Sequence, residues 1–147
     1  MKNSFKILCG LILVILFLNS CEEDPFNLFN DDPRDRITGT WVVDEDSEIF
    51  KKKDLNRIYT VTITKDAQDS AVVLVKNFYE FGENEEIKMV MDGRNLDIPD
   101  QTVDGFRVEV GSGTISLDFE TITLYYYVAF TGDRDVVRAD YSRPENR

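Results

Sequence analysis

Two of the side chains that often carry out enzyme chemistry, histidine and cysteine, are absent or rare in this 147-residue chain. It has no histidine, and therefore lacks the commonest general base and the commonest zinc ligand. The segment Gly111-Ser112-Gly113 does not have the Gly-x-Ser-x-Gly spacing of a nucleophile elbow. Residues 44–48 are acidic but lack the glycine and the closing glutamate of a calcium loop. We therefore expect a non-enzymatic protein without catalytic residues, metal or cofactor.

The charge of the chain narrows the classes of partner. It has 28 acidic and 17 basic residues, a net charge of −11. Such a chain repels a phosphate backbone, so nucleic acid is not expected as a partner. Carboxylates are so numerous that no pair stands out for glycoside hydrolysis, which leaves an enzyme as a third hypothesis only. The single basic run, Lys51-Lys52-Lys53, is interpreted as a solvated loop tip rather than a site for an anionic head group.

Cys21 directly follows the most apolar segment of the chain. Lys2 and Lys6 precede an apolar run at residues 7–18, which has the length of a signal-peptide core and is shorter than the roughly 20 residues of a bilayer-spanning helix. The sequence Leu18-Asn19-Ser20-Cys21 resembles the lipobox of bacterial lipoproteins. That resemblance implies cleavage after residue 20 and lipidation of Cys21, for instance with palmitate. The alternative is an ordinary secretory signal peptide with a chance cysteine.

Lipidation of Cys21 would anchor the mature chain to a membrane through its acyl chains. Loss of the two lysines in residues 1–20 leaves 15 basic against 28 acidic residues, a net charge of −13. Charge alone should therefore not hold the protein on anionic lipid. Because Cys9 lies in the removed segment, no free thiol would remain for a disulfide.

Residues 21–36 separate the predicted anchor from the rest of the chain. They are rich in acids and proline and show no periodicity, which predicts a disordered acidic tether. The cluster Glu22-Glu23-Asp24 resembles the export signals of surface lipoproteins in Bacteroidetes-type bacteria. This resemblance implies an outer-membrane lipoprotein that faces the cell exterior. The periplasmic face is the alternative.

Residues 37–147 are expected to form one small all-β domain. In residues 57–65, apolar side chains alternate with threonines, which is typical of a half-buried strand. Gly111-Ser112-Gly113 is expected to turn or bulge the chain. Residues 47–56 are the best candidate for a short helical turn, capped by Asp46 or Ser47. The expected strands are residues 38–44, 57–65, 71–78, 85–91, 96–98, 102–110, 114–119, 121–131 and 135–143.

The spacing of these segments, with strand centres about every 8–12 residues, is typical of a barrel or sandwich. An antiparallel meander of eight to nine strands removes its exposed edges most simply by closing into a barrel. At eight strands the interior is filled by side chains or holds one small ligand. A two-sheet β-sandwich is the alternative fold.

The triplet Gly39-Thr40-Trp41 resembles the Gly-x-Trp signature of lipocalins and related calycins. The resemblance implies a small lipocalin-like barrel in which Trp41 packs across the closed end under an arginine of the last strand. Arg143 is favoured over Arg138 because it shares its side of the strand with apolar residues. The family's Thr-Asp-Tyr motif is absent, and the chain is shorter than a full lipocalin. It is more similar to the compact lipocalin-like domains on lipoproteins of Bacteroidetes-type bacteria.

Two functional hypotheses follow. In the first, the barrel is a binding module for a small apolar ligand. Its interior would be lined by Ile63, Phe78, Met89, Val108, Leu124 and Tyr126. In the second, the protein is a structural or accessory subunit of a cell-surface complex of the glycan-uptake type. Its partner protein would contact an outward-facing patch formed by Tyr125 and Tyr127.

Overall fold

The computed structural model describes residues 31–53 and 57–145. The predicted signal peptide, Cys21 and the acidic cluster lie outside these residues. Residues 32–147 belong to one compact unit. Within the described ranges, no helix is both long enough and apolar enough to cross a bilayer.

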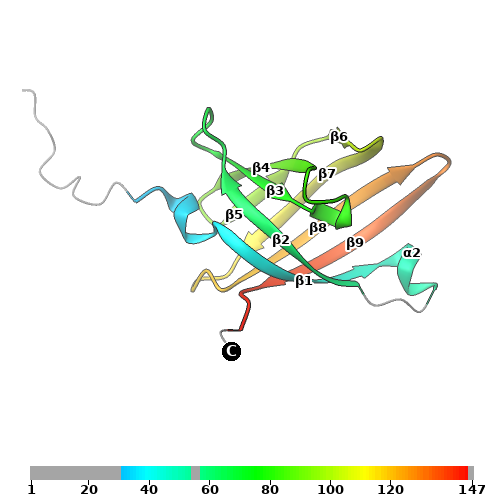
Figure 1. The fold of residues 1–147 in the computed structure, drawn as a ribbon, viewed down its shortest axis with the longest axis horizontal. Helices are drawn as coiled ribbons and strands as arrows, with labels where there is room; N and C mark the ends of the chain where they lie inside the picture. The colour runs from blue at the N-terminus through cyan, green and yellow to red at the C-terminus, as the bar shows by residue number, and fades with distance from the viewer. Residues whose placement is uncertain (1–30, 54–56, 146–147) are drawn as a thin grey trace, which may run out of the picture. The chain divides into compact units, whose positions relative to one another are not determined.

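The described chain is an all-β structure of nine antiparallel strands, as the alternation predicts (Figure 1). Three short helical segments accompany the strands: the 3₁₀ turns η2 (Pro33–Arg36) and η3 (Phe78–Glu80), and the single-turn helix α2 (Glu48–Lys51). The strands are β1 (Gly39–Ser47), β2 (Arg57–Lys65), β3 (Val72–Lys76), β4 (Glu86–Asp92), β5 (Asn95–Ile98), β6 (Gln101–Val103), β7 (Phe106–Ile115), β8 (Thr121–Phe130) and β9 (Asp133–Ser142).

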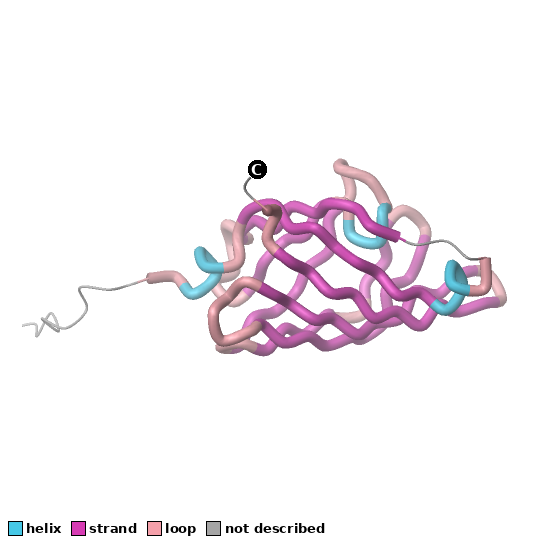
Figure 2. The backbone as a smooth tube through the Cα atoms, turned by 90° about the horizontal axis from the view of Figure 1, so that it is seen from below, coloured by secondary structure: helices cyan, strands magenta, loops and turns pink. Residues whose placement is uncertain are grey.

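The sheet closes on itself. Its strand order is β5-β4-β3-β2-β1-β9-β8-β7-β6, and an additional pairing of β5 with β7 joins the ends into a ring of eight strands. The ninth strand, β6, pairs with β7 beside β5. Figure 2 shows the strands wrapping around a common interior. The closed barrel is thus confirmed, and the alternative of a two-sheet sandwich is wrong.

The path of β7 differs in detail from the expected strands. Residues 106–115 form one long strand with a bulge between Glu109 and Ser112, where a turn between two strands was the alternative. A side chain at Gly111 would lie 2.6 Å from the Tyr125 carbonyl oxygen, so this position has room only for glycine. The bulge falls where the partner of β7 changes from β6 to β5. The two partners are separated at Pro99, which has no N–H to donate.

The barrel has two different ends. We call the end where the described chain begins the entry end; it holds η2, Trp41 and the end of β9. Trp41 is fully buried, and its Nε1 donates a 2.8 Å hydrogen bond to the Ile37 carbonyl. The Arg143 guanidinium lies 3.9 Å from the ring centroid, the position that the calycin resemblance implies, and also donates to the Thr38 carbonyl. Arg143 is only partly buried, and a cation–π contact that is open to water contributes about 0.5–1 kcal/mol.

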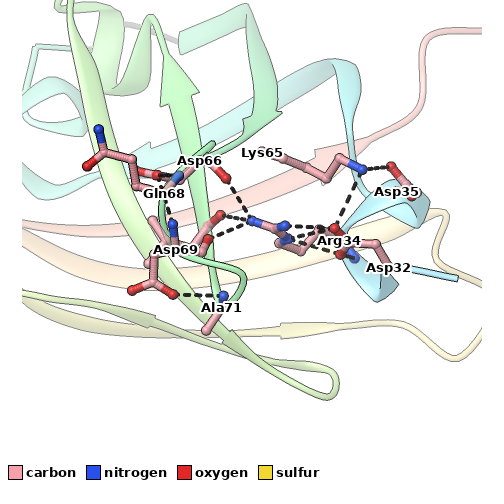
Figure 3. A network of polar contacts seen from close by, with 9 residues as sticks. Asp32, Arg34, Asp35, Lys65, Asp66, Gln68, Asp69 and Ala71 are labelled. Carbon is pink, nitrogen blue, oxygen red and sulfur yellow. Dashed lines mark hydrogen bonds and ion pairs between the residues drawn. The ribbon is translucent and has the colours of Figure 1, made fainter. Parts of the chain in front are cut away.

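The predicted disordered tether is wrong for its last residues, because η2 is ordered and packs on the domain (Figure 3). Asp32 caps the turn and also accepts from the Arg34 Nε at 2.9 Å. The buried Arg34 reaches the turn between β2 and β3. Its Nη1 donates to the carbonyls of Asp66, Asp69 and Val72 at 3.1, 2.7 and 2.9 Å. The prediction of a disordered tether used only local composition, which carries no information about acceptors more than 30 residues away in the sequence.

Candidate functional site

Aromatic side chains gather at the end of the barrel opposite η2, which we call the mouth. α2 and η3 lie at this end, as Figure 1 shows. The Phe81 and Phe106 rings are stacked with centroids 5.4 Å apart, and Phe130 meets Phe106 edge-on at 5.3 Å. Tyr79 lies 5.3 Å from Phe81 and 6.3 Å from Phe50. These spacings lie in the range of favourable aromatic pairs.

The rings line a hollow of about 360 Å³. This volume falls in the range of small-molecule sites, which are mostly apolar with a few fixed polar groups. Four of the rings are only partly buried, so part of their apolar surface lines the hollow and is not covered by the core. The residues around it are Phe50, Arg57, Tyr79, Glu80, Phe81, Asp104, Phe106 and Phe130.

One wall of the hollow is a turn with unusual backbone geometry. Asn77, Tyr79 and Glu80 have φ angles of 58°, 54° and 59°, the left-handed region that L side chains rarely adopt. The turn is held by contacts to its neighbours. Asn77 Nδ2 donates to the Thr60 carbonyl at 2.8 Å, and the Tyr79 hydroxyl donates to Asp135 at 2.7 Å. Backbone strain that is held in this way concentrates at binding and switch sites.

Arg57 lies beneath the hollow, with only 6% of its side chain exposed. Its guanidinium carbon lies 4.2 Å from the Phe50 ring centroid and 4.3 Å from that of Tyr79. Nη1 donates to Glu45 at 2.6 Å, Nη2 donates to the Tyr79 carbonyl at 2.7 Å, and Nε donates to Glu80 at 3.0 Å. A buried cation is tolerated because each of its nitrogens has an acceptor.

Glu45 is the buried partner of Arg57, and none of its side chain is exposed. The hydroxyls of Tyr59 and Tyr126 donate to its Oε2 at 2.5 and 2.8 Å. Burial raises the pKa of the Glu45 carboxyl above its ordinary value, and the charge of Arg57 and these hydroxyls oppose that rise. Burial also raises the pKa of both tyrosines, so their hydroxyls remain proton donors. The network therefore holds Arg57 in one orientation.

Asp135 holds α2 and η3 in place at the mouth. It is fully buried and accepts hydrogen bonds from the Ser47 hydroxyl at 2.5 Å, the Ile49 N–H at 3.0 Å and the Tyr79 hydroxyl at 2.7 Å. Ser47 is also the N-cap of α2 and accepts from the Phe50 N–H, which decides between the two caps, Asp46 and Ser47, that the sequence left open. One carboxylate on β9 thus ties α2 and η3 together, which makes the hollow largely preformed.

The six residues predicted to line a ligand cavity are all inside the barrel, each at most 1% exposed. They belong to one continuous apolar core, in which the Phe78 and Tyr126 rings lie 4.5 Å apart. The Tyr126 hydroxyl is engaged by Glu45. The hollow at the mouth is not lined by any of the six: Ile63, Phe78, Met89, Val108, Leu124 and Tyr126.

Sequence reasoning missed the mouth because its rings come from connections and strand ends. Phe50 is in α2 and Phe81 directly follows η3, while Phe106 and Phe130 stand at the ends of β7 and β8. One signal in the sequence could have found the mouth. In an antiparallel barrel, the start of β7, the end of β8 and the connections that carry Phe50 and Phe81 all lie at the same end. The basic run also lies here and is exposed, with Lys51 Nζ paired to Asp46 at 3.1 Å and Lys53 Nζ 5.7 Å from the Phe50 ring.

The exposed apolar patch is centred on Tyr125 and not on the predicted pair of Tyr125 and Tyr127. Tyr125 is 55% exposed, but Tyr127 is partly covered by the Arg134 guanidinium, 3.8 Å from its ring centroid. Val110 (66% exposed) and Val136 lie beside Tyr125 at a hollow of about 350 Å³ next to the β7 bulge. Both tyrosines border this second hollow.

Within residues 31–53 and 57–145, no group of histidine, cysteine, aspartate and glutamate side chains is placed to hold a metal ion. A scan against protein-family models and a search of curated proteins found no match to the chain. The barrel and its two ends are therefore the basis of any functional argument.

Proposed function

We propose that this protein is a non-enzymatic binding module that takes a small, largely apolar ligand into the aromatic mouth of its barrel. The observation that carries the proposal is the preformed hollow of about 360 Å³, walled by five aromatic rings. Exposed aromatic surface costs free energy in water, and a ligand that covers it recovers that cost. The site proposed is at the mouth and not deep among the six core residues.

We further propose that the protein is an outer-membrane lipoprotein anchored through Cys21, facing the cell exterior. The lipobox-like sequence before Cys21 and the acidic cluster after it support this assignment. The described chain enters the barrel at η2, and the mouth lies at the opposite end. An anchor upstream of η2 would therefore attach to the end of the barrel that carries no ligand, leaving the mouth free.

The binding proposal is tested with a neutral apolar fluorophore, N-phenyl-1-naphthylamine. We expect saturable binding, and a loss of at least about tenfold in affinity when Phe81 and Phe106 are both replaced by alanine, since this removes two stacked aromatic contacts of about 0.5–1.5 kcal/mol each beyond their area burial. Phe119→Ala is the matched control, because Phe119 is a half-buried ring packed by Arg36 away from the mouth. Failure of the fluorophore to bind, or equal losses in both variants, would overturn the proposal.

The anchoring proposal is tested with Cys21→Ala. This variant should leave the membrane fraction, because a protein of net charge −13 has no electrostatic attraction to anionic lipid. The unmodified sequence should incorporate radioactive palmitate and be digested by protease added to whole cells. Retention of Cys21→Ala in the membrane would refute lipidation as the anchor. Palmitate labelling without digestion would refute only the surface assignment.

A second candidate function is a docking subunit of a surface complex. It is favoured by the exposed apolar group of Val110, Tyr125 and Val136 beside the second hollow. Arg134 and Arg138 flank the tyrosines, and Arg138 Nε donates to the Tyr125 hydroxyl at 3.3 Å. The two arginines are half exposed and are paired with Glu109 and Asp140 at 3.5 and 2.7 Å. We therefore propose a protein partner that offers an apolar side chain ringed by carboxylates, which would share these arginines with Glu109 and Asp140.

The docking surface is tested by replacing Tyr125 and Val110 with serine. A partner that co-purifies with the unmodified protein should be lost from the double variant at unchanged thermal stability, because both side chains are exposed. Its binding to the unmodified protein should weaken as salt is raised. A partner retained by the double variant would show that this face is not the interface.

A further inference from the structure

We infer that the mouth selects ligands that carry a carboxylate, and that Glu80 occupies the position of that carboxylate in the empty protein. The inference rests on the proposed binding function and adds to it the chemical class of the ligand and a built-in competitor. It starts from the way in which Arg57 divides its hydrogen bonds between buried and exposed acceptors.

Two of the acceptors of Arg57 belong to the interior. Nη1 donates to Glu45, whose side chain is fully buried, and Nη2 donates to the Tyr79 carbonyl. The remaining edge of the guanidinium, formed by Nε and Nη2, meets Glu80 at 3.0 and 2.9 Å. Arg57 and Glu80 both line the hollow. The Nε–Nη2 edge is therefore the part of Arg57 that a molecule in the mouth can reach.

Glu80 uses this edge incompletely. Both nitrogens contact the same oxygen, Oε2, whereas a carboxylate placed in the plane of a guanidinium bonds it with two parallel hydrogen bonds. A ligand carboxylate that enters from the hollow is free to adopt this paired geometry. Its apolar part would then lie against Phe81, Phe106 and Phe130.

Glu80 is also easy to displace. Its side chain is 49% exposed, so once released it is solvated, unlike the buried Glu45. Its backbone is in the left-handed region, at φ 59°, which an L side chain adopts at a steric cost. Exchange of one carboxylate for another leaves the number of carboxylates in contact with Arg57 at two. A neutral or cationic ligand cannot make this exchange, which gives the mouth its selectivity.

Isothermal titration with three probes of the same ring size tests the inference: 2-naphthoate, 2-naphthamide and 2-naphthylmethylammonium. The unmodified protein should bind naphthoate most tightly. Glu80→Gln keeps the shape of the side chain but weakens its bond to Arg57. It should raise the affinity for naphthoate about tenfold, or ~1.4 kcal/mol, and leave that for naphthamide within about twofold. Glu83→Gln, an exposed acid in the turn that follows η3, is the matched control and should change neither affinity.

The outcomes separate the inference from the function on which it rests. If naphthamide or the amine binds as tightly as naphthoate, or Glu80→Gln and Glu83→Gln have equal effects, the carboxylate inference is wrong and the mouth remains a binding site. If no probe binds to any of the proteins, both are wrong. As a direct check, the Arg57 Nε–H resonance should shift on addition of naphthoate and not of naphthamide.

Discussion

The two ends of the barrel each hold a buried arginine, and the two arginines are used differently. Arg34, at the entry end, is 7% exposed and so is Arg57, at the mouth. Arg34 donates to three backbone carbonyls and to Asp32, only two residues away (Figure 3). Arg57 donates mainly to side chains from other strands and turns, and two aromatic rings cover its faces.

This difference separates a structural contact from the recognition site that we propose. The carbonyls that Arg34 caps are part of the turn after β2 and have no way to exchange with a ligand. Among the partners of Arg57, Glu80 is half exposed and stands beside a hollow. A buried cation becomes available for binding when one of its acceptors can leave. Glu80 bonds Arg57 through one oxygen and is 49% exposed, whereas Asp32 bonds Arg34 through both oxygens and is 26% exposed. The following changes test the contrast, starting with the largest expected effect.

Arg57→Met should be the most destabilising change. It leaves Glu45 buried without its cation, which typically costs about 3–5 kcal/mol of the free energy of unfolding. Adding Glu45→Gln should recover much of this loss, because the amide carries no charge and its oxygen still accepts from Tyr59 and Tyr126. Urea unfolding of the single and double variants measures both effects. A double variant less stable than Arg57→Met would show that the unpaired charge is not the cause.

Arg34→Met should destabilise the protein less than Arg57→Met does, because it leaves capped carbonyls near the surface rather than a buried charge. Amide hydrogen exchange should speed up in residues 66–72, where the carbonyls lose their donor. Affinity for N-phenyl-1-naphthylamine should not change, since the mouth is at the other end. Weakened binding of this probe would mean that the two ends are coupled.

Glu80→Gly should be more stable than Glu80→Ala by about 0.5–1 kcal/mol. Both variants remove the carboxylate and its bond to Arg57, but only glycine adopts the φ of 59° without steric cost. Thermal unfolding of the pair therefore measures the strain held in the wall of the mouth. The same pair of substitutions at Glu83, which is not among the residues with positive φ, should favour alanine. Equal stability of the two Glu80 variants would contradict a strained turn.

The smallest effect is a difference in pH dependence. The hydrogen bond from Arg34 holds the pKa of Asp32 well below its ordinary value of 3.8. A depressed pKa stabilises the fold above pH 3.8, and this contribution is lost as the pH falls further. The difference in unfolding free energy between the unmodified protein and Asp32→Asn should therefore be constant near neutral pH and shrink below pH 3.8. A difference that does not shrink in acid would contradict the pair.

At the mouth, the contribution of Glu45 to stability should change with pH in the opposite direction. Burial raises the pKa of Glu45 above 4.5, so the folded state holds its proton longer than the unfolded state does. The stability of the unmodified protein relative to Glu45→Gln should therefore fall as the pH rises through and above 4.5. Opposite slopes for the two substitutions would distinguish the two ends by acid–base behaviour alone.

Local patterns in the sequence predicted most of the strands and favoured closure over a two-sheet sandwich. The expected strand 102–110 is divided by a turn at residues 104–105 into β6 and β7, and the expected strand 114–119 is only the end of β7. Alternation at period two depends only on neighbouring residues, so strands such as residues 57–65 were predicted with their bounds. The cap at Ser47 and the burial of Trp41 also follow from residue types at fixed positions. Because alternate residues of a strand share a face, Arg57 lies on the inner face of β2 together with Tyr59. The sequence alone did not reveal which acidic side chain would pair with Arg57.

Only the tertiary structure decided where the site lies. Ser47 and Asp135 are 88 residues apart, Tyr79 and Asp135 are 56 apart, and Arg57 and Glu80 are 23 apart. These contacts depend on strand register and on which connections meet at one end of the barrel, and no local pattern records either. For the same reason η2 was predicted to be disordered, since its carbonyl acceptors lie more than 30 residues away. Composition reports what a segment can do by itself, whereas the contacts that order it come from the rest of the fold.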